Sequence, residues 1–266
     1  MTAKHFLLSL VFIPTILCGQ DTLMADHYFN KADSLKKAGE PDSAITYFIK
    51  AAEAYQKLNK HERYVTCFNN IGVIFNRQDK YEEAKLLLDA ALETGLRYLG
   101  ETEAVATTYI TLGVTYNAEE NYTKSLEMHG KALNMRLKLF GKHHADVATS
   151  YGNIGNVYFN AQNYTDAIKN HKQALAIRQK VFGGEGLELT QSYNGLGNAY
   201  REKEEYKKAL EYFNKSLQIR KTKLGETHKD VGKSYKDISQ VYFLMKNQEQ
   251  CDFYKRKSDE ILAPSK

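Results

Sequence analysis

The sequence predicts an all-α protein built from stacked pairs of helices. One stretch recurs along the chain, because residues 149–183 align with 191–225 after a shift of 42 residues, and with 107–141 after the same shift backwards. Within each copy, apolar residues recur at spacings of three and four, which is the period of an α-helix. A fixed period of this size is typical of helical repeat proteins, in which neighbouring units share one continuous core.

Each repeat is predicted to contain a helix, a short turn and a longer second helix. In the copy at 148–183, Ile154 and Gly155 belong to the apolar face of the first helix, and a second apolar series runs from Tyr164 to Phe182. Gly183 follows at the point where a helix end favours a residue with positive φ. We therefore expect the second helix to stop at this glycine.

Small residues recur at two positions of the repeat. Glycine inside a helix costs about 1 kcal/mol relative to alanine, so its recurrence indicates a close contact between helices. The first column is Gly72, Gly113, Gly155, Gly197 and Ser239, and the second is Ala44, Ala84, Ser125, Ala167, Ala209 and Cys251.

Six repeats are expected, near residues 25–60, 64–100, 106–141, 148–183, 190–225 and 232–262. They form one domain at 22–262, followed by a disordered tail at 263–266. In the first repeat, Pro41 suits the first position of a helix. Asp146 and Asp230 end their loops and are interpreted as helix N-caps. The last helix is rich in Lys and Glu, as expected of a capping element with a polar outer face.

The repeat resembles the tetratricopeptide repeat, with its aromatic-x-x-Leu-Gly-x-x-Tyr spacing. The matching residues are Tyr109, Leu112, Gly113 and Tyr116, then Tyr151, Ile154, Gly155 and Tyr158, then Tyr193, Leu196, Gly197 and Tyr200. The 42-residue form, with Arg136–Val147, Arg178–Gly183 and Arg220–Val231 between units, is similar to the repeats of kinesin light chain and related adaptors. This resemblance implies a right-handed α-solenoid of about six helix-turn-helix repeats.

Residues 1–19 are interpreted as a signal peptide. Lys4 precedes an apolar run at 6–17, and no acidic residue occurs before Asp21. The run is shorter than the roughly 20 residues that span a bilayer, so no stable membrane span is expected after cleavage. The protein is then exported, either periplasmic or extracellular. The alternatives are a buried or disordered N-terminal helix in a cytoplasmic protein and, less well supported, a lipoprotein modified at Cys18.

Composition and motifs argue against several other classes. The net charge is +5 without a block of basic residues, which gives nucleic-acid binding no support. No phosphate-binding loop, nucleophile elbow or paired-cysteine motif occurs, so the protein is not expected to be an enzyme or to hold a cofactor. His129 and His171 share a column with Leu88, which favours packing over a metal site. Cys67 and Cys251 are interpreted as packing residues and not as a disulfide, because the repeats that contain them are separated by three others.

The candidate functional surface is the other face of each first helix, which lines a concave side in stacked helical repeats. Asparagine is a poor helix former, yet it recurs on this face, and its amide can both donate and accept hydrogen bonds. In the kinesin light chain-like family the corresponding column binds extended peptides. The resemblance thus implies peptide binding, against the alternatives that these side chains are solvated or bond between repeats. The candidate residues are Asn69, Asn70, Asn76, Asn117, Asn153, Asn156, Asn194, Asn198, Arg201 and Lys236.

This face changes character along the chain. One column reads Val73, Val114, Asn156, Asn198 and Gln240, and positive charge is added near its end by Arg201, Lys233 and Lys236. We therefore expect a ligand that is apolar near repeats two and three and polar or acidic near repeats five and six. The predicted function is a protein-interaction scaffold. The alternatives are a sensory or regulatory module of a bacterial signalling system and a cytoplasmic adaptor.

Overall fold

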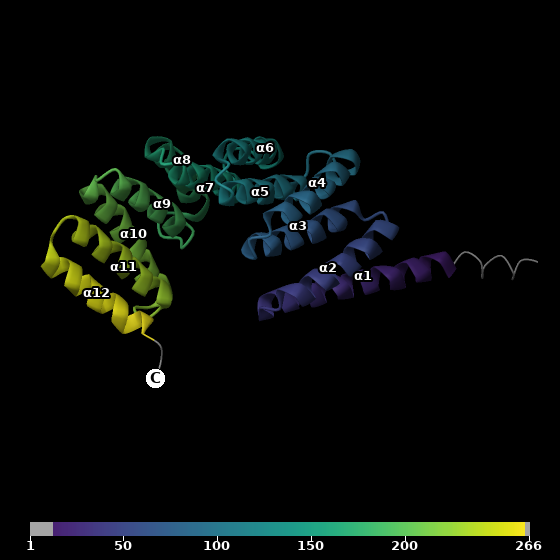
Figure 1. Cartoon of the computed structure of the whole chain (residues 1–266), viewed down its shortest axis with the longest axis horizontal. Helices are drawn as coiled ribbons and strands as arrows, with labels where there is room; N and C mark the ends of the chain where they lie inside the picture. Colours follow the sequence, from purple (N-terminus) through teal and green to yellow (C-terminus); the bar gives the residue numbers. More distant parts are fainter. Residues whose placement is uncertain (1–12, 264–266) are drawn as a thin grey trace, which may run out of the picture. The chain divides into compact units, whose positions relative to one another are not determined.

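A computed structural model of the chain describes residues 13–263, where every regular element is an α-helix (Figure 1), so the predicted all-α class is confirmed. The helices in this range are α1 (Ile13–Ala38), α2 (Pro41–Lys57), α3 (His61–Arg77), α4 (Tyr81–Tyr98), α5 (Glu103–Ala118), α6 (Tyr122–Phe140), α7 (Ala145–Asn160), α8 (Tyr164–Phe182), α9 (Leu189–Glu202), α10 (Tyr206–Leu224), α11 (Lys229–Leu244) and α12 (Gln248–Leu262).

The chain divides into two units, Met1–Met135 and Arg136–Lys266, with the division inside α6. In the first unit, α1 packs on α2 and α3 on α4, while α2 contacts α3 and α4 contacts α5. In the second unit, the pairs are α7 with α8, α9 with α10 and α11 with α12, joined through α8 with α9 and α10 with α11. Helices α2, α4, α8 and α10 therefore each pack between two first helices, as helical repeats require.

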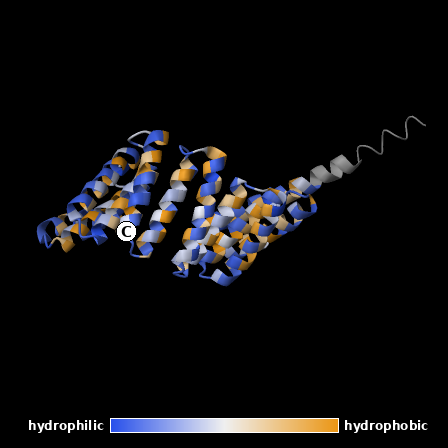
Figure 2. Ribbon diagram, turned by 90° about the horizontal axis from the view of Figure 1, so that it is seen from above, coloured by the Kyte–Doolittle hydropathy of each residue, from blue (hydrophilic) through white to orange (hydrophobic). Residues whose placement is uncertain are grey.

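Each unit has its own apolar core, because every helix carries both apolar and polar residues (Figure 2). In the first unit, Phe48, Tyr55 and Ile71 are fully buried between α1, α2 and α3. In the second, Leu196, Phe213 and Ile238 are buried between the helices of the last two repeats. The helical stripes seen in the sequence thus account for the core of both units.

The glycine column makes the close contact that its recurrence predicts. A Cβ at Gly155 would come within 2.9 Å of the His171 ring, so only glycine lets α8 approach α7 this closely. The same arrangement pairs Gly72 with Leu88, Gly113 with His129 and Gly197 with Phe213. In the last repeat Ser239 replaces the glycine, and its hydroxyl donates to the backbone carbonyl of Cys251 at 3.0 Å.

The turn inside each repeat adopts left-handed backbone geometry. Gly39 provides it in the first repeat with φ of 81°. The other repeats use non-glycine residues there, at a cost of roughly 1–2 kcal/mol each. They are Asp79, Glu120, Gln162, Glu204 and Lys246. Gly183 ends α8 with φ of 77°, as the sequence indicates, and Pro41 is the first residue of α2.

The loops between repeats correct one prediction. Asp146 and Asp230 are not N-caps, because α7 and α11 begin one residue earlier. The N-cap is instead His144, whose Nδ1 accepts from the Asp146 backbone N–H at 3.2 Å, and His228 does the same for Asp230 at 3.1 Å. An imidazole nitrogen thus replaces the carboxylate oxygen that the sequence predicts as the acceptor.

Most of the predicted signal segment, residues 1–12, lies outside the described range, as do residues 264–266 of the predicted tail. Helix α1 begins at Ile13, inside the predicted segment, so the signal peptide stays a prediction. No described helix is long and apolar enough to cross a membrane. Cys67 and Cys251 are buried free thiols, one in each unit, which agrees with their interpretation as packing residues.

Candidate functional site

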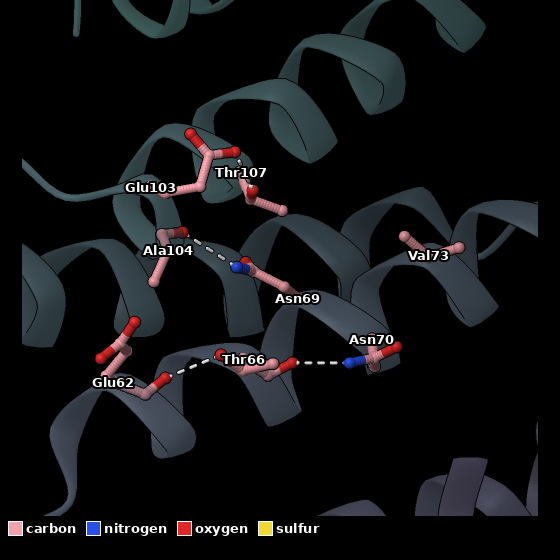
Figure 3. A pocket seen from close by; sticks show the side chains of 8 residues that line it. All are labelled: Glu62, Thr66, Asn69, Asn70, Val73, Glu103, Ala104 and Thr107. Carbon is pink, nitrogen blue, oxygen red and sulfur yellow. Dashed lines mark hydrogen bonds between the residues drawn. The ribbon is translucent and has the colours of Figure 1, made fainter. Parts of the chain in front are cut away.

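A pocket of about 280 Å³ lies between α3 and the N-terminal end of α5 in the first unit (Figure 3). It contains three residues that the sequence places on the candidate face, Asn69, Asn70 and Val73. The remaining lining residues lie nearer the helix N-termini and comprise Glu62, Thr66, Glu103, Ala104 and Thr107.

Asn69 holds two repeats together at this pocket. Its side chain is only 5% exposed, and its Nδ2 donates to the backbone carbonyl of Ala104 at 3.0 Å, as Figure 3 shows. The same carbonyl accepts a hydrogen bond from the Thr108 hydroxyl. Asn69 therefore bonds between repeats, which is the alternative to ligand binding that the sequence leaves open for this column.

Asn70 and Asn76 are also engaged within the protein. The Oδ1 of Asn70 accepts from the Lys36 ammonium at 2.7 Å, which connects the first repeat to the second. Asn76 donates to the Thr111 carbonyl at 3.4 Å and accepts from the Thr115 hydroxyl at 2.9 Å, which connects the second repeat to the third. Asn117 is half-buried on α5. In the first unit, Asn69, Asn70 and Asn76 thus stabilise the contacts between repeats.

The asparagines of the second unit are placed differently. Asn156 is exposed on α7, while Asn153 and Asn198 are half-buried on α7 and α9. Among the described residues, none of these three side chains has a hydrogen-bond partner. Asn194 is half-buried, and its Oδ1 is shielded from solvent without a donor from the described part of the chain. The second unit therefore presents amide groups that its own fold does not use.

Charged residues of the candidate face gather near the last repeat. Arg201 pairs with Glu202 at 3.0 Å and donates to Gln240 of the next first helix at 3.0 Å. Lys236 is exposed. Burial raises the pKa of Asp237, although the positive charges of Arg201, Arg220 and Lys236 act in the opposite direction. The predicted positive charge is thus partly balanced by acidic residues on the same helices.

The sequence reasoning missed the first-turn residues of the pocket, including Glu62 and Glu103. The first helices begin about one turn before the predicted repeat boundaries at 64 and 106, since α3 starts at His61 and α5 at Glu103. Continuing the three- and four-residue spacing backwards from Asn69 would have reached Thr66 and Glu62. The signal was present, but the predicted helix boundaries excluded it.

The described residues contain no group of three or more His, Cys, Asp and Glu side chains suited to hold a metal ion. Two buried histidines, His129 and His171, fill the space beside glycines instead. Burial lowers the pKa of His171 to about 4, and the charge of Arg178 contributes, so this ring is neutral near pH 7. The site is therefore a surface of amides and charges suited to hydrogen bonding.

Paired helices with a polar face on each first helix define a helical repeat scaffold, a class that binds other proteins. The model of the tetratricopeptide repeat family matches residues 22–96, 104–180, 146–222 and 191–250. The chain therefore belongs to the tetratricopeptide repeat family, as its resemblance to that family predicts.

Solved structures show the same fold at low sequence identity. The chain resembles BtubC (BKLC) from P. vanneervenii, with a TM-score of 0.69, 16% identity and coverage of 92% of this chain and 91% of that one. It also resembles a proposed kinesin light chain with nearly identical TPR-like repeats from Podosopora anserina. The TM-score is 0.66 and the identity 17%, and the match covers 76% of this chain and 96% of that one. A third similar structure is a Rap protein complexed with competence and sporulation factor. Its TM-score is 0.64 and its identity 15%, and the match covers 90% of this chain and 75% of that one. A search of curated proteins gives no match.

Proposed function

We propose that this protein is an interaction scaffold whose second unit holds an extended peptide segment through Asn153, Asn156 and Asn198. The observation that carries the proposal is that these amides lie on first helices without hydrogen-bond partners among the described residues. An amide that donates and accepts can bind the backbone of an extended peptide without requiring a particular side chain. The Rap protein of the same fold, solved with competence and sporulation factor, is consistent with ligand binding by this architecture.

The first unit has a different role in this proposal. Its amides Asn69, Asn70 and Asn76 are engaged between repeats, whereas Val73 and Val114 are 36% and 44% exposed on the same face. Within the first unit, the candidate face therefore offers apolar contacts, whereas the second unit offers free amides.

The test begins with a peptide array probed with the full chain, followed by affinity measurements on the bound peptides. We expect the double variant Asn156→Ala/Asn198→Ala to weaken binding about tenfold, because each lost hydrogen bond is worth roughly 0.5–1.5 kcal/mol. A matched control is Asn170→Ala/Asn214→Ala, on α8 and α10, where each amide bonds only to its own helix backbone. Equal affinity of the wild type and the first double variant would overturn the proposal, and so would equal losses in both variants.

A further inference from the structure

The first turns of α7 and α9 enclose a second pocket, of about 390 Å³, in the second unit. It occupies the position in the fourth and fifth repeats that the α3–α5 pocket occupies in the second and third. Ala145 stands where the first pocket has Glu62, and Gln191 stands where it has Thr107. Glu188 takes the place of Ala104. The two pockets thus lie at equivalent positions of the repeat but differ in the charged residues that line them.

Arg178, a residue of α8, also lines the pocket between α7 and α9. The first pocket has Asn69 at the position that Gly152 occupies here, and the absent side chain leaves room for the guanidinium. A Cβ at Gly152 would lie 3.7 Å from Nη2 and 3.9 Å from Nη1 of Arg178. Arg178 is only 3% exposed, yet it lines the pocket.

The guanidinium of Arg178 has no acidic partner within ion-pair distance among the described residues. Nη1 donates to the Ser192 hydroxyl, and Nη2 donates to Oε1 of Gln191 at 2.6 Å, so both hydrogen-bond partners are neutral. Burial lowers the pKa of Arg178, and no acidic group counteracts this effect. A buried cation without a counter-ion is costly, because the protein replaces water with weaker neutral dipoles.

The equivalent arginine in the next repeat, Arg220, lies near acidic groups that have no counterpart acting on Arg178. Arg220 donates to the Asp230 backbone carbonyl at 3.3 Å. Burial lowers the pKa of Arg220, but the negative charges of Asp230 and Asp237 act in the opposite direction. At the Arg178 junction, Glu188 stands in the place of Asp230. Its carboxylate lies over Gly186 instead, where Oε2 is 2.6 Å from the position of a Cβ. Arg178 thus keeps its positive charge without an ion-pair partner among the described residues, although the Glu188 carboxylate lies at the rim of the pocket.

We propose that the α7–α9 pocket binds a carboxylate of the peptide ligand through Arg178, an inference that rests on the proposed function. The carboxylate replaces the amide oxygen of Gln191 at Nη2, and a charge-assisted hydrogen bond is stronger than a neutral one. Gln191 is exposed and can turn away into solvent. The carboxylate belongs either to an Asp or Glu side chain or to the C-terminus of the ligand.

Two substitutions at the rim test the site without altering Arg178, whose removal would disturb the α8–α9 contact. Ala145→Glu copies Glu62 and adds negative charge in the first turn of α7, where a carboxylate also stabilises the helix. Glu188→Gln removes the negative charge already at the rim. We expect the first variant to weaken carboxylate binding about threefold at low salt, and the second to strengthen it by a similar factor.

The experiment is an NMR titration of the full chain that follows the Arg178 Nε–Hε signal. The probes are acetyl-Ala-Ala-Glu-Ala-Ala-amide, acetyl-penta-alanine with a free C-terminus, and acetyl-Ala-Ala-Gln-Ala-Ala-amide. We expect the first, the second or both to shift this signal and to respond to the two rim variants. Comparison of these two probes identifies the source of the carboxylate, while the Gln peptide should leave Arg178 unaffected.

Failure of this inference differs from failure of the proposed function. One outcome is that all three probes bind with equal affinity, that the rim variants do not change this affinity, and that Asn156→Ala/Asn198→Ala lowers it. Peptide binding then stands and the carboxylate site is refuted. If carboxylate probes shift the Arg178 signal and follow the rim variants but ignore that double variant, the carboxylate site stands and the role of the asparagines is refuted. If no probe perturbs Arg178 in the wild type or in Glu188→Gln, the carboxylate site is refuted.

Discussion

The imidazole of His171 occupies the space that a side chain at Gly195 would need, across the junction between the fourth and fifth repeats. A Cβ at Gly195 would lie 2.5 Å from Cε1 of the ring, and one at Gly155, in the same repeat as His171, would lie 2.9 Å from it. The ring therefore fits between two glycines on successive first helices. This arrangement couples α7, α8 and α9 through one buried side chain.

Gly195→Ala should destabilise the protein by about 1–3 kcal/mol, because a methyl group forced into a packed core displaces its neighbours. The measurement is the midpoint of thermal or urea unfolding. The matched control is Gly130→Ala, also in a helix, where nothing lies within 4 Å of the new Cβ. The control should stabilise the protein by up to about 1 kcal/mol through helix propensity. A Gly195→Ala variant as stable as the control would contradict this packing.

His171→Phe, which copies Phe213 of the next repeat, should remove part of the acid sensitivity. The native pKa of His171, lowered to about 4 by burial and by Arg178, lies below the ordinary value of 6.5. The unfolded chain therefore binds the proton first as pH falls. Stability from the neutral ring is fully present above pH 6.5 and is lost between pH 6.5 and 4, by about 3 kcal/mol at most.

The measurement for His171→Phe is the unfolding midpoint of wild type and variant between pH 7.5 and about 4. The difference between the two curves isolates His171 from other groups, such as Asp237, whose raised pKa acts with the opposite sign. Parallel curves across this range would show that the ring is not the titrating group.

Much of the fold can be predicted from the sequence, because the three- and four-residue spacing reports which face of each helix is buried. The recurrence of Gly155 also predicts a close contact. The sequence does not reveal that His171 fills this space, since that depends on how far a second helix is inserted between its neighbours. Nor does it show that Asn69 bonds to the next repeat while Asn156, which stands in the column of Val73, does not. Both positions lie on the candidate face, and the orientation of each first helix decides which of them reaches the next backbone.

Asn69→Ala and Asn156→Ala should therefore differ in their effect on stability. Asn69→Ala removes the bond to the Ala104 carbonyl and should cost about 1 kcal/mol, a moderate value because Thr108 still donates to that carbonyl. Asn156→Ala changes an exposed side chain without a partner among the described residues and should stay within about 0.5 kcal/mol of wild type. Urea unfolding of both variants checks the difference, and a reversed order would contradict the assigned roles.

Lys246→Gly should stabilise the last repeat. Lys246 has φ of 58°, which strains an L-residue, whereas the equivalent turn of the first repeat uses Gly39. Relief of this strain is worth about 1 kcal/mol, reduced by the greater freedom of glycine in the unfolded chain. The reciprocal change, Gly39→Ala, should lower stability by a similar amount, although nothing lies within 4 Å of its Cβ. Thermal unfolding measures both, and a lower melting temperature for Lys246→Gly would refute the assignment of strain.

The two buried thiols allow local opening of each unit to be measured by alkylation. Cys67 lies in the first unit and Cys251 in the second, and burial raises the pKa of Cys67 to about 12. Alkylating reagents attack the thiolate, so each cysteine becomes reactive only when its surroundings loosen. With Cys18 replaced by serine, the two alkylation rates would report local opening of the two units separately. A bound partner would lower the alkylation rate of the cysteine in the unit to which it binds.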